Sequence, residues 1–291
     1  MNTRPALPAY APLLKPALFR AGRATASQRV SLVAAGCAFY ATLALFPAIT
    51  MLISLYGLVY NPSTVQPQLH QLESFMPAAA FSLISERIRN VVAQPANGLG
   101  LSFLLSLLIS FWSSSTGTKS ILNALSLAYH ERETRGLIRF QLVALSMTLI
   151  AIIGVAMAIG FLVFVPVLLA FLGLSGHAQL LVSLISFAAM VLFVLVALGL
   201  LYRFGPAGGG RVFYAPGAAI ATVSWLVVSW AFGFYVGRFA VYSATYGPLA
   251  TLIGLMMWFY LSAYIVLFGA EVNAALDREW RQYQARLARA G

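Results

Sequence analysis

The sequence predicts an all-α, polytopic membrane protein with six transmembrane helices, and three observations carry that prediction. The chain is 61% hydrophobic and only 9% charged, whereas a soluble domain is about 25% charged. Long apolar runs recur from one end of the chain to the other. Basic residues gather in alternate connections between those runs, which is the pattern of a protein oriented across a membrane.

The six predicted spans follow from the length of the apolar runs. A helix that crosses the hydrocarbon core needs about 20 mostly apolar residues. The runs are continuous, whereas the strands of a membrane barrel alternate apolar and polar residues in segments of about 10. Helices are therefore favoured, and the predicted spans cover residues 32–59, 99–129, 137–172, 178–202, 212–236 and 249–276.

The basic residues predict the orientation of these spans. One side of the membrane receives Arg4, Lys15, Arg20, Arg23, Arg29, Arg132, Arg135, Arg139, Arg203, Arg211, Arg278, Arg281, Arg286 and Arg289. Only Arg87, Arg89 and Arg238 fall on the other side. Since basic loops mark the cytoplasmic face, both termini are expected there, as an even number of spans requires. The net charge of +11 is thereby explained without a nucleic-acid partner.

Three regions follow from this topology. Residues 1–30 form a basic, interfacial N-terminal segment on the cytoplasmic side, with a helix expected to start at Pro16, a favourable first helical position. Residues 31–277 form the six-helix transmembrane domain. Residues 278–291 form a basic cytoplasmic tail.

The long loop at residues 60–97 is predicted to face outward. It carries apolar residues at one-face helical spacing on either side of Pro77, namely Val65, Leu69, Leu72 and Met76, then Phe81, Ile84, Ile88 and Val91. This spacing predicts two short amphipathic helices lying on the outer membrane surface. A helical cap packed on the bundle is the alternative.

Lys119 and Glu271 are the ionisable residues that lie well inside predicted spans. Counting along the second and sixth spans places both at a similar depth, near the cytoplasmic leaflet. A charge at the centre of a bilayer costs about 2.5–3.5 kcal/mol on insertion scales, so we expect the two side chains to lie close together. This pair is either a functional polar site or a structural ion pair, unless each charge reaches the inner interface separately.

Further polar residues extend this candidate intramembrane site. Ser115, Thr116, Lys119, Asn123 and Ser126 fall on one face of the second span, and Asn273 lies near Glu271. Such a stripe either lines a cavity or bonds a neighbouring helix. Hydroxyl groups can also bond the carbonyls of their own helix.

Ser229, Gly233 and Gly237 are spaced four residues apart in the fifth span. Small residues at this spacing let two membrane helices approach closely. We therefore expect helix packing at these positions.

Enzyme chemistry has little support in the sequence. His70, His130 and His177 lie in three different loops, and Cys37 is the lone cysteine, so no cluster has metal-ligand spacing. The three glycines at residues 208–210 lack the Lys-Ser/Thr of a phosphate-binding loop. No enzymatic activity, metal or cofactor is predicted.

Four stretches resemble a known family. They are AFYATLALFP at residues 38–47, WSSSTGTKS at 112–120, LYRF at 201–204 followed by YAPGA at 214–218, and YSATYG at 242–247 followed by FGAEVN at 268–273. Together these stretches, spread over residues 30–277, resemble the YihY/BrkB family of bacterial inner-membrane proteins, formerly labelled ribonuclease BN. The resemblance implies six transmembrane helices and a location in the bacterial cytoplasmic membrane.

The sequence is compatible with three functions to different degrees. The leading hypothesis is participation in the transport of envelope lipids or other amphiphiles, with membrane lipids as partners, because a polar stripe and buried charges occur in a chain without a soluble domain. The alternative is a membrane scaffold that binds an envelope protein through the outer loop. A ribonuclease is disfavoured, because nuclease chemistry normally uses clustered carboxylates or a histidine pair. A cavity opening beside Lys119 and Glu271 would favour the transporter.

Overall fold

The structure is a computed structural model that describes residues 11–26, 28–59, 101–171, 177–208, 214–238 and 248–290. Every regular element in these ranges is a helix, as the sequence predicts. The helices are α1 (Ala11–Thr25), α2 (Gln28–Val59), α5 (Leu101–Ala128), α6 (Leu137–Phe171), α7 (His177–Phe204), α8 (Ala215–Arg238) and α10 (Pro248–Ala290).

Each of the six predicted apolar runs forms a helix, from α2 to α10. The count of six spans is not established by these helices. Among the described residues, four stretches are both long and apolar enough to cross a membrane, and a bent pair, Leu13–Thr25 with Arg29–Leu45, would add a fifth. The four stretches are Leu137–Val155, Leu184–Phe204, Ala215–Val236 and Leu252–Arg289.

The described part of α5 is not among these stretches. Its central run, residues 113–120, contains serine, threonine, glycine and lysine in place of aliphatic residues. This run includes Ser115, Thr116 and Lys119 of the predicted polar stripe, and its residues lower the hydropathy of the described part of α5.

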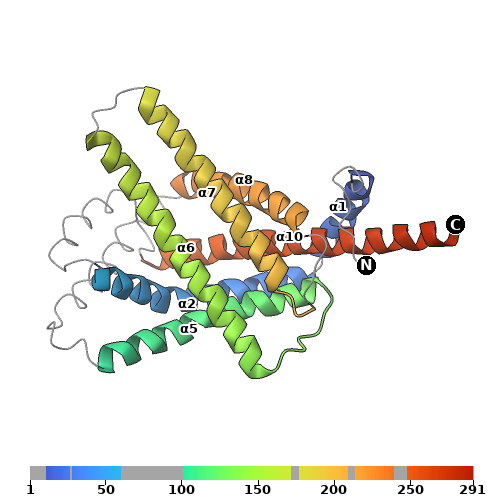
Figure 1. Ribbon diagram of the computed structural model, residues 1–291, viewed down its shortest axis with the longest axis horizontal. Helices are drawn as coiled ribbons and strands as arrows, with labels where there is room; N and C mark the ends of the chain where they lie inside the picture. The colour runs from blue at the N-terminus through green and yellow to red at the C-terminus, as the bar shows by residue number, and fades with distance from the viewer. Residues whose placement is uncertain are drawn as a thin grey trace.

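Helix α10 is the centre of the arrangement. It contacts α1, α2, α5 and α8, and Figure 1 shows it running along the molecule with α2 and α5 on one side and α8 on the other. Helices α6 and α7 cross this group obliquely in the view. The most extensive helix pair is α2 with α5, which places the polar stripe of α5 beside the first predicted span.

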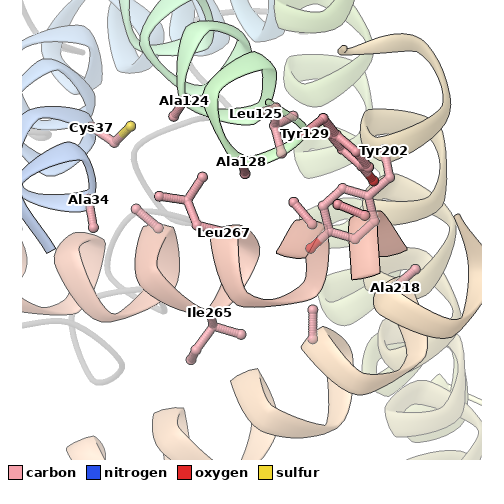
Figure 2. Close-up of a cluster of buried hydrophobic side chains, with 14 residues drawn as sticks. Ala34, Cys37, Ala124, Leu125, Ala128, Tyr129, Tyr202, Ala218, Ile265 and Leu267 are labelled. Atoms are coloured by element: carbon pink, nitrogen blue, oxygen red, sulfur yellow. The ribbon is translucent and has the colours of Figure 1, made fainter. Parts of the chain in front are cut away.

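The main core lies between α2, α5, α7, α8 and α10. It combines large side chains such as Leu125, Tyr202 and Leu267 with many alanines. Figure 2 shows Tyr129 and Tyr202 at one end of this cluster, with Ala34 and Cys37 at the other. Small side chains let the helices approach closely, which is how helices associate where lipid supplies no hydrophobic driving force.

Helix α1 packs on α10 through a small-residue face. Ala17 and Ala21 are fully buried against α10 residues that include Val272 and Leu276, and Arg20 forms an ion pair of 3.0 Å with Glu279. Pro16 lies inside α1, not at its first position, so the expected start was placed too late. Helix α1 and the beginning of α2 meet at an angle of 70°.

Two further predictions concern the basic tail and the outer loop. The basic tail at residues 278–291 is largely a continuation of α10, which remains helical to Ala290 with its arginines exposed. The outer loop at residues 60–97, with its two expected amphipathic helices, lies outside the described residues.

Candidate functional site

The polar residues of α5 divide between two faces. On the first face, Ser115 is fully buried and its Oγ donates to the carbonyl of Trp112 at 2.6 Å. That same Oγ accepts a bond of 3.3 Å from the Nε2 of Gln141 in α6. Thr118 shares a hydroxyl–hydroxyl bond of 2.7 Å with Thr148, also in α6. These residues therefore join α5 to α6, which is the packing alternative for the stripe.

The second face borders an open pocket between α2 and α5 with a volume of about 450 Å³. We call this pocket the Lys119 groove. Its polar lining consists of Thr116, Lys119, Ser120 and Asn123 from α5, while Gly36 and Tyr40 of α2 form part of the opposite wall. The cavity alternative for the stripe thus applies to this face.

A close helix approach positions the two walls of the groove. Gly117 is buried, and a Cβ atom there would lie 3.1 Å from the Cβ of Ala44 and 3.5 Å from the carbonyl oxygen of Tyr40. Only glycine lets the two backbones come this close without displacement. The Oγ of Ser120 also lies 3.4 Å from the sulfur of Cys37.

Lys119 has an aromatic neighbour. Its Nζ lies over the ring of Trp112, 5.3 Å from the centroid, a cation–π distance. Trp112 is 57% exposed and stands two helical turns from Lys119. Among the described residues, no carboxylate lies within ion-pair distance of Lys119.

Glu271 is paired elsewhere. It is 4% exposed, and its Oε2 lies 3.7 Å from a guanidinium nitrogen of Arg278. That oxygen accepts no hydrogen bond within the described part of the chain. The sequence predicts that Lys119 and Glu271 lie close together, in direct or water-mediated contact. The described residues show no direct ion pair between them, and Glu271 is paired instead with Arg278, two turns further along the same helix. The expectation rested on depth alone, which leaves the direction of each side chain open.

Asn273 lies in a different environment from the one expected. It is fully buried, and its Oδ1 accepts a bond of 2.8 Å from the backbone N–H of Gly217 in α8. Its Nδ2 donates to the hydroxyl of Tyr129 at 3.2 Å and to the carbonyl of Tyr214 at 3.3 Å. Asn273 therefore ties α10 to α8 and to the chain that follows α5.

Two glycines allow this contact. A Cβ atom on Gly217 would lie 2.5 Å from the Asn273 side chain, and one on Gly269 would lie 2.8 Å from the carbonyl oxygen of Gly217. Beside them, the buried Tyr202 donates its hydroxyl to the carbonyl of Val266 at 2.7 Å. We call Asn273, Gly217, Gly269, Tyr202 and Tyr129 the Asn273 knot. The motifs YAPGA and FGAEVN contain Gly217, Gly269 and Asn273, but the sequence alone did not indicate that these residues pack together.

The predicted packing of Gly233 is wrong for the described fold. Gly233 is exposed, and a Cβ atom there would meet nothing within 4 Å. The packed face of α8 instead carries Gly217, and sixteen residues later the helix has turned by about 160°. Ser229 is half-buried, and the surroundings of Gly237 lie outside the described residues.

The connections after α5 and after α7 are linked to each other. The backbone N–H of Gly208 donates to Glu131 at 2.9 Å, and Arg135 donates to the carbonyl of Gly205 at 2.8 Å. Arg135 also forms a two-pronged pair with Glu133, both bonds being 2.7 Å. The hydrogen bonds and charge of Arg135 lower the pKa of the Glu133 carboxyl. We call these contacts the loop latch.

No group of three or more histidine, cysteine, aspartate or glutamate residues in the described ranges is arranged to hold a metal ion. His130 is notable for its backbone, with a φ of 58°, and its Nδ1 lies 3.0 Å from the carbonyl of Ala128. This geometry ends α5 and directs the chain into the loop latch.

Comparisons with known proteins place the chain in a family. The family model described as "Virulence factor BrkB" matches residues 21–290. YfkH of Bacillus subtilis (strain 168), which its name calls ribonuclease-like, is 34% identical over 246 residues, covering 83% of this chain and 88% of that relative.

Membrane proteins of another series are similar over a shorter region. A UPF0761 membrane protein of Xanthomonas campestris pv. campestris (strain B100) is 40% identical over 83 residues, which cover 28% of this chain and 20% of that relative. No solved structure matches the chain. The extent of the family match, together with the motifs in the sequence, shows that this chain belongs to the BrkB family of membrane proteins.

Proposed function

We infer that this chain is a six-span bacterial inner-membrane protein that binds a lipid or another amphiphile in the Lys119 groove and takes part in its transport. The observation that carries this proposal is the groove itself. Its volume of about 450 Å³ falls within the range of roughly 300–1,000 Å³ that is typical of small-molecule sites. A cavity was expected beside both Lys119 and Glu271, and the groove is lined by Lys119 and not by Glu271. A solid bundle would have favoured a scaffold.

The surroundings of the groove suit an amphiphile. Its polar groups come from one helix, α5, and include Lys119 and Asn123. The adjoining surface of α2 exposes Phe39 and Leu43, which are 49% and 52% accessible. A polar headgroup in the groove would leave its acyl chain against this apolar surface, as expected for a ligand taken from the bilayer.

A test of the groove uses two matched glycine substitutions. Gly36→Leu places a side chain into the groove, since a Cβ atom there meets nothing within 4 Å. Gly22→Leu makes the same change on α1, where the space is also open. The full chain is purified in mild detergent and its retained lipid is measured by mass spectrometry. We expect Gly36→Leu to lose retained lipid and Gly22→Leu to keep it; equal retention in both variants would refute groove binding.

The proposed topology has both termini in the cytoplasm and residues 60–97 outside. The distribution of basic residues supports it. A cysteine introduced by Gln68→Cys, in a background that lacks Cys37, should react with a membrane-impermeant maleimide in intact cells. A cysteine introduced by Ala288→Cys on the exposed end of α10 should react only after lysis. The reverse pattern would overturn the topology.

We further infer a role that is not enzymatic. At the inner end of the bundle, the buried side chain of Asn273 is occupied by structural bonds, and the described residues contain no cluster of three or more metal-ligating side chains. The ribonuclease-like name of YfkH defines the test, in which purified chain is incubated with RNA and Mg²⁺ or Mn²⁺. Cleavage that co-elutes with the folded chain through two orthogonal chromatographic steps would refute this part of the proposal.

A further inference from the structure

Lys119 is a cation whose neutralising anion is missing from the described part of the chain. The acid expected to pair with it, Glu271, is paired with Arg278. Among the described residues, the partner of the Lys119 Nζ is the ring face of Trp112, a weak and exposed partner. A cation inside a membrane helix is costly unless it is paired or hydrated. The site is therefore incomplete in electrostatic terms.

The space beside Lys119 is the groove, and the other polar groups there are neutral. Thr116 and Asn123 each supply a hydrogen-bond donor, whereas the hydroxyl of Ser120 donates to the sulfur of Cys37. Among the described residues, no acidic side chain lines the pocket. One cation with two donor-bearing neighbours is an arrangement that binds oxyanions. A quaternary ammonium or another cationic headgroup would meet the repulsion of Lys119 without a compensating carboxylate.

We propose that the Lys119 groove selects amphiphiles with an anionic headgroup, and that the bound phosphate or carboxylate is the counter-ion of Lys119. This inference rests on the proposed lipid-binding function and names the substrate class of the same site. The headgroup lies beside Lys119, while the hydrocarbon chain follows the exposed apolar surface of α2. Binding exchanges the weak contact with Trp112 for a charge-assisted hydrogen bond.

The chemical class is tested on the wild-type chain first. The delipidated full chain is titrated with phosphatidylglycerol and with phosphatidylcholine of identical acyl chains, and the bound populations are measured by native mass spectrometry. We expect a preference of roughly tenfold for phosphatidylglycerol, equivalent to about 1.4 kcal/mol. Equal binding of the two lipids would overturn the headgroup selectivity while leaving lipid binding intact.

Substitutions then assign the selectivity to Lys119. Lys119→Gln should lower the preference to near onefold, and Lys119→Arg should retain it. Lys15→Gln removes an exposed lysine on α1, outside the groove, and should leave the preference unchanged. If Lys119→Gln keeps the full preference, or Lys15→Gln abolishes it, the anion is bound by the general basic surface and the proposal fails.

Two further measurements separate the possible failures. Inorganic phosphate at millimolar concentration should not displace phosphatidylglycerol, because the hydrocarbon chain contributes to binding; full displacement would mean that the site takes a free anion and not an amphiphile. Gly36→Leu should reduce the binding of both lipids. If it reduces neither, the lipids bind outside the groove and the proposed function fails with the selectivity.

Discussion

The Asn273 knot and the Lys119 groove are two polar regions of one helical bundle, and they differ in how completely their polar groups are bonded. In the knot, the side chain of Asn273 makes three hydrogen bonds to two other segments of the chain. In the groove, Lys119 faces an open space of about 450 Å³ with one aromatic contact. The extent of bonding therefore separates the two regions: Asn273 has a structural role, and the open environment of Lys119 is the basis of the binding role that we propose for it.

The largest effect expected from this comparison is steric. Gly217→Leu should prevent folding, because even a Cβ atom would lie 2.5 Å from the Asn273 side chain, and overpacking by more than a methyl group exceeds the usual cost of about 1–3 kcal/mol. Gly233→Leu makes the same change in the same helix where nothing lies within 4 Å. Monodisperse yield on size-exclusion chromatography measures both. A well-folded Gly217→Leu would show that the knot is not tightly packed.

A smaller loss is expected from removing the bonds of the knot without adding bulk. Asn273→Leu leaves the N–H of Gly217 without its partner and removes two further bonds, to the hydroxyl of Tyr129 and the carbonyl of Tyr214. An unsatisfied buried group costs about 1–3 kcal/mol, and a lost hydrogen bond costs about 0.5–1.5 kcal/mol, so we expect a loss of about 3 kcal/mol in total. The measurement is thermal unfolding in detergent. The same loss for Asn123→Leu, a groove residue, would remove the distinction between the two regions.

In the groove, removal of the polar side chain should raise the stability of the lipid-free chain, whereas in the Asn273 knot it should lower the stability. Lys119→Met removes a charge that has no acidic partner in the described ranges, so the lipid-free chain should gain about 1 kcal/mol of stability. The same variant should lose its preference for anionic lipid. Thermal unfolding with and without phosphatidylglycerol separates the two effects. A marked loss of stability without lipid would assign Lys119 to the structural class.

The smallest effect is expected at the loop latch. Its polar groups are bonded more completely than Lys119 and less completely than Asn273. Arg135 lowers the pKa of Glu133, so this carboxylate stabilises the fold above its ordinary pKa, and the contribution is lost as the pH falls through the lowered value. Wild type should therefore unfold at a higher temperature than Glu133→Gln at neutral pH. The difference should shrink as the pH falls below the ordinary glutamate pKa of about 4.3 and vanish once the pH is well below the lowered pKa of Glu133. A difference that is constant with pH would exclude ionisation as its cause.

The lengths of the apolar runs in the sequence were sufficient to predict the helices. The six apolar runs correspond to α2, α5, α6, α7, α8 and α10, because the requirement to satisfy backbone hydrogen bonds in lipid leaves little choice of structure. The start of α1 was missed, since Pro16 is compatible with the interior of a first helix as well as with its beginning. The continuation of α10 through the basic tail was also missed, because charge marks a change of solvent and not the end of a helix.

The partners of the polar residues could not be predicted in the same way. Depth along a span suggested a pair of Lys119 with Glu271, but rotation about the helix axis decides which neighbour a side chain meets. Spacing by four likewise selected Gly233, whereas the packed glycine of α8 is Gly217. Both cases depend on which face of a helix is covered, and that is set by tertiary packing. Thr116, Lys119 and Asn123 line one groove, since residues three or four apart share a helix face. Ser115, which was predicted on the same face, instead bonds Gln141 of α6.

The loop latch has a consequence for how the chain is made. Arg135 reaches a carbonyl 70 residues further along the sequence, and Glu131 an amide 77 residues further. On the ribosome, both side chains emerge before these backbone partners exist, and until α6 and α7 have been synthesised Arg135 has its neighbour Glu133 as a partner. A nascent chain that stalls within those helices keeps an open acid–base cluster at the end of α5. In the complete chain both groups are bonded, so the connection after α5 reaches its final form only after α7 has been synthesised.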